Sequence, residues 1–170
     1  MASSFRDDLQ DFYQGEIIGE ALFDRMLDFY DDPVHCHKVA LMLQLETETK
    51  ARLRPAMLEL GVDLRELDAS REAGLTMAAS LADKPWADAM AMLHEALLPF
   101  VERYTAIAAQ APAPYRDLAQ SMVRHETSLL RFAARESAGD TTNSTADIVA
   151  QLQYPLPPPA NDPSYEPLPT

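Results

Sequence analysis

The sequence of 170 residues predicts an all-α protein, an up-down four-helix bundle with one long crossover between the second and third helices. Four long segments repeat apolar residues at alternating spacings of three and four, which is the pattern of a helix with one buried face. Their connections are short, long and short, as in two helical hairpins joined by one crossover. Apolar residues make up 47% and charged residues 24% of the chain, a composition typical of a soluble globular domain.

Turn signals bound the first two helices. The first is expected over residues 8–30 and ends at Asp31-Asp32-Pro33, because proline does not continue a helix. The second is expected over residues 35–60 and ends at Gly61, since glycine readily adopts the conformation found just past a helix end. Pro55 falls inside the second helix and predicts a kink there.

The second helical hairpin is bounded by prolines and a glycine. The third helix is expected over residues 84–109, because proline is tolerated in the first turn of a helix. Pro99 lies within this helix and predicts a second kink. The fourth helix opens after Pro112 and Pro114 and ends at Gly139.

The crossover between the two hairpins is long for a helix connection. It runs from Gly61 to Lys84 and contains short helical patterns over residues 64–73 and 75–81. The sequence therefore predicts local helical structure within the crossover.

The composition changes after residue 139, so we expect the bundle over residues 1–139 and a separate segment over residues 140–170. Ser144 is placed to cap a short fifth helix over residues 145–153. The arm that follows, YPLPPPANDPSYEPLPT, holds seven of the chain's 13 prolines, which excludes helix and central strand. It is either disordered or lies on the bundle or on a neighbouring subunit. Four apolar side chains favour docking: Tyr154, Leu156, Tyr165 and Leu168.

The charge of the chain excludes two classes of partner. With 27 acidic and 14 basic residues the net charge is −13, and no segment supplies the basic surface that nucleic acid or an anionic membrane requires. Small molecules, metal cations or a second copy of the chain in a homodimer fit this charge. The single cysteine, Cys36, and an N-terminus (MASSFRDDLQ) without a secretory signal predict a cytoplasmic protein.

Glutamates interrupt the apolar faces of three helices. Either Glu16 or Glu20 does so in the first helix, Glu46 in the second and Glu126 in the fourth. A buried carboxylate is costly unless a cation, a proton or hydrogen-bond donors meet it. Carboxylates that converge from facing helices bind iron, manganese or magnesium well, so the pattern indicates a metal site.

Three segments that carry these glutamates resemble the ferritin-like superfamily: IIGEALF, LQLETETKARL and MVRHETSLLRFAARE. The resemblance extends from Asp8 to about Gly139. It implies a di-iron-type carboxylate site in which Glu20 is the first-helix ligand, with Glu16 one turn away as its substitute. By the same resemblance, Glu46 and Glu126 are the carboxylates of the two Glu-x-x-His pairs.

The sequence departs from the superfamily pattern at three positions. Thr49 and Leu129 stand where the pattern has its two histidines, and Glu95 of the third helix lies away from the apolar face. A standard di-iron centre with four carboxylates and two histidines is therefore not encoded in its usual form. His94, beside the apolar face of the third helix, is the candidate for a nitrogen ligand. His125 lies a step off the apolar stripe of the fourth helix.

Two metal-free interpretations of the glutamates stay open. Arginines could reach inward and pair with them, from positions 25, 52, 103, 124 or 131. Alternatively, the carboxyl groups are protonated and bond to Tyr13, Tyr30 or Tyr104.

Two functions follow from these interpretations. The first is a metal-dependent oxidoreductase in which iron or manganese activates dioxygen or peroxide, as the resemblance implies. The second is a metal-free bundle that acts as a dimeric binding or scaffolding module.

Overall fold

The computed structural model describes residues 4–160 and 162–163, and every regular element in that part of the chain is helical. The prediction of an all-α protein is therefore confirmed. The elements follow in the order α1 (Phe5–Met26), α2 (Pro33–Glu59), α3 (Asp68–Leu81), α4 (Trp86–Gln110), the 3₁₀ helix η1 (Ala113–Tyr115), α5 (Arg116–Ser137) and α6 (Ala146–Val149). The four long helices lie where the sequence predicts them, with ends that differ by a few residues.

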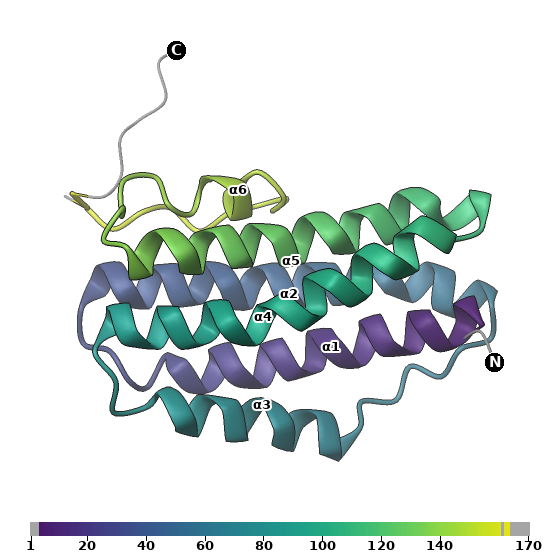
Figure 1. Cartoon of the computed structure of the whole chain (residues 1–170), viewed down its shortest axis with the longest axis horizontal. Helices are drawn as coiled ribbons and strands as arrows, with labels where there is room; N and C mark the ends of the chain where they lie inside the picture. Colours follow the sequence, from purple (N-terminus) through teal and green to yellow (C-terminus); the bar gives the residue numbers. More distant parts are fainter. Residues whose placement is uncertain (1–3, 161, 164–170) are drawn as a thin grey trace, which may run out of the picture.

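The long helices form two antiparallel pairs, α1 with α2 and α4 with α5 (Figure 1). The crossover returns the chain along the length of the molecule, so α2 and α4 run in the same direction. On its way, α3 lies alongside α1, its main packing partner. Helix α4 changes direction near its middle, where Pro99 is located, as the sequence predicts for that residue.

Capping residues account for several helix ends. Ser4 and Asp7 form a capping box at the start of α1, and Asp32 accepts a hydrogen bond from the second residue of α2 behind Pro33. Gly61 and Gly139 follow α2 and α5 with φ angles of 64° and 77°, the left-handed conformation that glycine adopts without steric cost. The helix ends predicted at these two glycines rest on this property.

The crossover contains the helical structure that the sequence predicts, as the single continuous helix α3 rather than two short segments. Gly74 lies in the middle of α3, and a methyl group there would collide with the backbone of α1 at Ile18. The glycine therefore lets two helices approach closely. Gln14 of α1 anchors the start of α3, because its side-chain oxygen accepts hydrogen bonds from the Leu67 amide (3.2 Å) and the Ser70 hydroxyl (2.9 Å).

A polar layer divides the buried apolar side chains into two clusters. The first lies toward the α1–α2 turn and contains residues such as Phe23, Met42, Leu93 and Phe132. The second lies toward the opposite end and contains Phe12, Leu53, Tyr104 and Met122. Along α2 and α5, Glu46 and Glu126 fall between the residues of the two clusters, and on α1 Glu16 lies at the edge of the second cluster, directly before Ile17.

A second buried polar cluster lies near the start of α2 and the end of α5. The Lys38 ammonium is 2.6 Å from a carboxylate oxygen of Glu136, and both side chains are almost fully buried. The Trp86 indole donates to the other oxygen at 2.7 Å, and the Ser144 hydroxyl also donates to the carboxylate. Every charge in this cluster has a partner.

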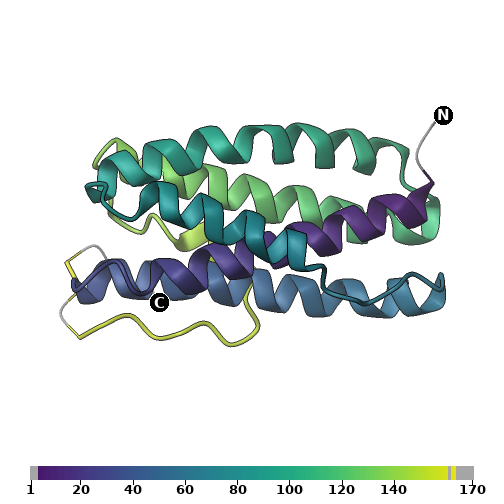
Figure 2. The same cartoon turned by 90° about the horizontal axis from the view of Figure 1, so that it is seen from below.

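The segment after α5 folds back over the bundle and then runs alongside α2 (Figure 2). Helix α6 is shorter than the predicted 145–153, but Ile148 and Leu152 join the apolar core. The arm is held mainly through its backbone: the Tyr154 carbonyl accepts from Gln44 at 2.7 Å, and the Gln153 amide donates to Glu48 at 2.9 Å.

In the described part of the arm, docking therefore does not use the two side chains that the sequence suggested there, Tyr154 and Leu156. The Tyr154 side chain is 78% exposed and that of Leu156 is also exposed. The other two apolar residues of the arm, Tyr165 and Leu168, lie outside the described residues. None of the helices in the described part of the chain is long and apolar enough to cross a membrane.

Candidate metal centre

Three buried side chains converge in the polar layer: Glu16 from α1 and the adjacent His125 and Glu126 from α5. One ligand atom from each lies within 4.8 Å of the others, a spacing that one metal ion can bridge. These three residues form a buried Glu/His/Glu group able to hold a metal ion.

Glu46 of α2 lies beside this group. Its Oε1 is 3.4 Å from Nε2 of His125, while Oε2 of Glu16 is 3.7 Å from the same nitrogen. The other ring nitrogen of His125, Nδ1, is 3.1 Å from the Thr49 hydroxyl. Thr49 therefore fixes the orientation of the imidazole, and Nε2 faces the carboxylates.

Several polar atoms of this layer are buried without a hydrogen-bond partner. They are both oxygens of Glu16, Oε2 of Glu126, Nε2 of His125 and the hydroxyl of Tyr104. The great majority of buried polar groups in folded proteins are satisfied, so unpaired atoms gathered at one place require an explanation. A cation among them would satisfy several at once.

The electrostatics of the group show how strongly burial acts on it. Burial, together with the nearby carboxylates of Glu46 and Glu126, holds the pKa of Glu16 well above its ordinary value. Burial also raises the pKa of Glu126 to about 7. Burial alone would lower the pKa of His125, but Glu46 and Glu126 outweigh it and raise that pKa. In the absence of a cation, the group therefore retains protons near neutral pH.

Two glycines of α1 make room for side chains from neighbouring helices. A methyl group at Gly15 would overlap the hydroxyl of Tyr104, and one at Gly19 would overlap the carboxylate of Glu46. The two glycines thus admit one phenol and one carboxylate into the polar layer.

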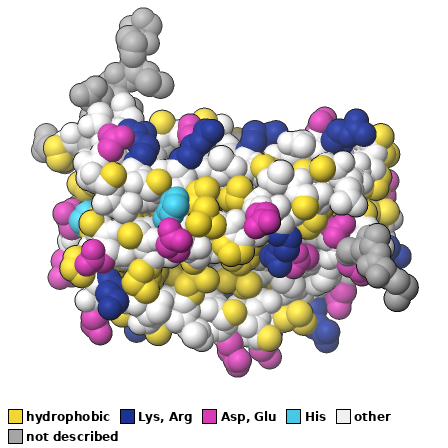
Figure 3. Space-filling view, viewed as in Figure 1, with side chains coloured by type: hydrophobic (Ala, Val, Ile, Leu, Met, Phe, Trp, Pro, Cys, Tyr) yellow, Lys and Arg dark blue, Asp and Glu magenta, His cyan; other side chains and the backbone are white. Residues whose placement is uncertain are grey.

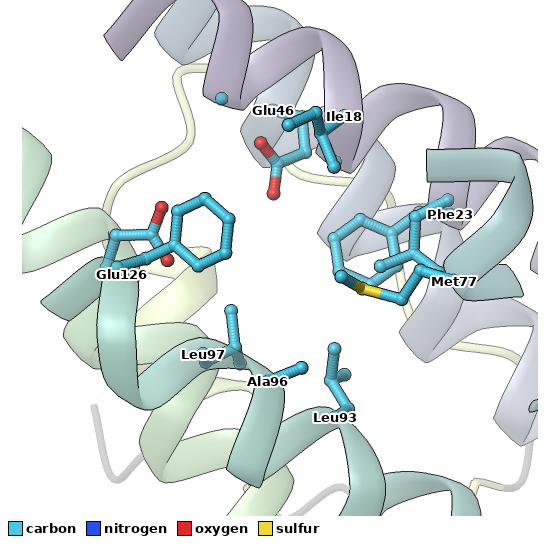
Figure 4. A pocket seen from close by; sticks show the side chains of 12 residues that line it. Ile18, Phe23, Glu46, Met77, Leu93, Ala96, Leu97 and Glu126 are labelled. Carbon is cyan, nitrogen blue, oxygen red and sulfur yellow. The ribbon is translucent and has the colours of Figure 1, made fainter. Parts of the chain in front are cut away.

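A small cavity of about 30 Å³ leads to this layer from the face where α4 passes α1 and α3. Figure 4 shows the carboxylates of Glu46 and Glu126 directed into the cavity, with apolar side chains such as Leu93, Leu97 and Met77 around them. Apolar side chains also gather over the middle of this face in the space-filling view (Figure 3). The volume is sufficient for a water molecule or a diatomic gas.

Two of the residues that the sequence proposed as ligands lie elsewhere. Glu20 forms an ion pair with Lys50, which also contacts Glu66 at 2.8 Å. His94 is partly exposed, and its Nδ1 lies 3.2 Å from the carboxylate of the adjacent Glu95. The structure brings together Glu16, Glu46 and Glu126 and adds His125 in place of His94.

Four of the five arginines suggested as internal partners of the glutamates have other contacts. Arg25 pairs with Asp28, Arg103 with Asp11 at 3.1 Å, and Arg131 with Asp147 at 3.2 Å. Arg52 contacts Glu48 and the carbonyl of Gln151. Each of these four side chains therefore engages a partner outside the buried group.

His125 is the residue of the group that sequence reasoning undervalued. It precedes Glu126 by one position and so points about 100° away from it around the helix axis. That offset places it off a narrow apolar stripe, but the buried face of α5 is broad and also includes Ser128 and Leu129. Its position directly before Glu126, which lies on the buried face, was the available signal in the sequence.

The donor set suits a hard or intermediate divalent ion. Carboxylate oxygens and one imidazole nitrogen are ligands of iron and manganese, and the burial of the group provides a dry environment. The unpaired atoms, the short distances between them and the donor types therefore all fit one bound metal ion.

Comparison of the chain with protein-family models, with curated proteins and with solved structures gave no match.

Proposed function

We propose that this protein is a ferritin-like, metal-dependent oxidoreductase that holds one iron or manganese ion between Glu16, Glu46, His125 and Glu126. The observation that carries the proposal is the set of unpaired buried atoms on three of these residues. Leaving a buried polar group unsatisfied costs about 1–3 kcal/mol, and more for a charged group. A bound cation would interact with these atoms and so remove this cost.

Two features support the ferritin-like part of the proposal. The chain forms two antiparallel helix pairs, and its long crossover makes α2 and α4 run in the same direction. In addition, Glu46 and Glu126 lie in the buried polar layer at positions that the resemblance assigns to ligands.

The ligand set supports one ion more than two. Three carboxylates and one imidazole gather in the layer, whereas the standard di-iron site uses four carboxylates and two histidines. At the position of one expected histidine, Thr49 orients His125 instead. The site that we propose is thus a smaller variant of the superfamily's site.

Bound iron or manganese would supply redox chemistry with dioxygen or peroxide. The protein contributes the rest. Glu16, Glu46 and Glu126 hold the ion and balance its charge, and Thr49 keeps Nε2 of His125 directed at it. Leu93 and its apolar neighbours limit the access of water to the carboxylates. Glu126, with a pKa of about 7 before a cation binds, is suited to release its proton near neutral pH when the ion binds.

Metal analysis after anaerobic loading tests the proposal. Protein incubated with ferrous or manganous ion and then desalted is expected to retain close to one equivalent. Glu46→Gln should lose the ion, whereas Glu48→Gln, a matched change on the outer face of α2, should retain it. Oxygen consumption by the loaded protein with a reductant then tests the oxidoreductase part. Failure of the wild-type protein to retain either metal would refute the proposal.

The alternative is a metal-free, dimeric binding or scaffolding module. Its specific support is the pair of exposed side chains on the arm, Tyr154 and Leu156. Raised pKa values of Glu16 and Glu126 also allow neutral carboxyl groups in the core. Sedimentation of the metal-free protein distinguishes this alternative: a dimer that Tyr154→Ser weakens supports it, and a monomer that retains metal does not.

A further inference from the structure

We propose that the phenol oxygen of Tyr104 is a further ligand of the ion in its ferric state. The inference rests on the proposed function and adds to it both a residue and a choice of metal, iron rather than manganese. It begins from α4, which encloses the polar layer but contributes none of its carboxylates or its imidazole.

Tyr104 is fully buried, and its hydroxyl has no hydrogen-bond partner among the described residues. The ring is held by apolar neighbours: it meets Phe12 edge-to-face at 4.6 Å and Phe100 at 6.2 Å between ring centroids. A phenol fixed in this way cannot turn its hydroxyl to solvent, so the oxygen must be satisfied from within the protein.

The hydroxyl points to the polar layer. It lies against Gly15, which lines the same cavity as Glu46 and Glu126. Burial raises the pKa of the Tyr104 phenol well above its ordinary value, and the charges of Glu126 and Glu16 add to this rise, which places the phenol within electrostatic reach of the group. Tyr104 thus belongs to the same set of unpaired buried atoms as Glu16, His125 and Glu126.

One ion accounts for this whole set. A phenol that has lost its proton is a hard, anionic oxygen ligand, and hard oxygen donors prefer highly charged ions. The trivalent state of iron meets that preference. When Tyr104 binds, its O–H bond breaks, the oxygen forms a bond to iron, and the proton passes to the solvent.

Visible absorption spectroscopy tests the assignment without a measurement of turnover. The protein is loaded anaerobically with ferrous ion and then oxidised with ferricyanide, which takes one electron from each iron. Coordination of a phenolate by ferric ion produces a charge-transfer absorption band in the visible range. The wild-type protein is expected to show this band, and Tyr104→Phe is expected to lose it.

Two control variants make the test specific. Tyr13→Phe removes another buried phenol from the same apolar cluster and should keep the band. Gly15→Ala leaves Tyr104 in the chain but displaces its hydroxyl, so it should lose the band while circular dichroism remains that of a folded helical protein.

The outcomes separate this inference from the proposed function. Wild-type protein that retains iron but shows no band would overturn the role of Tyr104 and leave the metal centre intact. A band that persists in Tyr104→Phe would overturn it as well. Wild-type protein that retains no iron would refute the proposed function itself, and this inference with it.

Discussion

Helix α5 carries two buried glutamates whose surroundings are opposite. Glu136, near its end, is 1% exposed and meets the ammonium of Lys38, the indole of Trp86 and the hydroxyl of Ser144. Glu126, near its middle, is 5% exposed and has an oxygen with no partner. Both carboxylates are removed from water to a similar degree.

The difference teaches how burial and function are related in this protein. At Glu136 the chain itself supplies a cation and donors, so the carboxylate contributes to the folded structure and needs nothing else. At Glu126 the chain supplies more acids and one imidazole, so the stable state requires protons or an added cation. A buried glutamate is therefore informative only together with its partners.

The largest effect is expected when the satisfied cluster is broken. Lys38→Ala leaves Glu136 buried without its cation and should lower the free energy of unfolding by about 3–5 kcal/mol. Arg25→Ala, which removes an exposed ion pair with Asp28, is the control and should cost less than about 1 kcal/mol. Urea unfolding followed by circular dichroism measures both. Equal decreases in the free energy of unfolding of the two variants would contradict the difference expected between the buried and the exposed ion pair.

A smaller effect is expected from pH on the metal-free protein. The pKa of Glu126 rises from 4.5 to about 7 on folding, so the folded state binds its proton more tightly than the unfolded state does. Stability is then highest at low pH within this range and falls as pH increases from about 4.5 to above 7, by about 3 kcal/mol for this group. The raised pKa values of Glu16 and His125 act in the same direction. Urea unfolding at pH 5, 6, 7 and 8 measures the trend, and Glu126→Gln should flatten it.

Metal should reverse this dependence. A cation binds the deprotonated carboxylates and the neutral imidazole, so the stabilisation that it provides increases with pH. Unfolding measurements with and without manganous ion at the same pH values give the comparison. A metal effect that is the same at every pH would contradict the assignment of the ligands.

The smallest effect is expected at Glu20, which the superfamily resemblance favours as a ligand. Its side chain is 18% exposed and pairs with Lys50, which keeps Glu66 as a second partner. Glu20→Gln should therefore cost about 1 kcal/mol or less and leave the metal content unchanged. Loss of the metal in this variant would show that the ligand on α1 is Glu20, one turn further along the helix than Glu16.

The sequence predicted the helices and their order because apolar spacing and turn residues are local signals. It could not decide between Glu16 and Glu20, which lie one turn and about 6 Å apart on α1. The rotation of α1 about its own axis decides between them, and packing against α2 and α3 determines that rotation. Lys50 then meets Glu20 on the outer side.

The remaining members of the site depend on contacts between distant segments. His125 joins the group because Thr49, 76 positions away in sequence, fixes its ring. Tyr104 reaches the layer because Gly15 lacks a side chain. Neither relation follows from a spacing within one helix, so single-sequence periodicity finds the carboxylates more readily than their neighbours.

The manner in which the arm is held affects how its sequence can change. The backbone groups of Gln153 and Tyr154 bind the side chains of Glu48 and Gln44, which lie one turn apart on α2. Most substitutions in this part of the arm preserve the groups that α2 recognises, whereas a single substitution on the helix removes a contact. Selection to keep the arm in place therefore acts mainly on the surface of α2, and the arm itself is free to diverge.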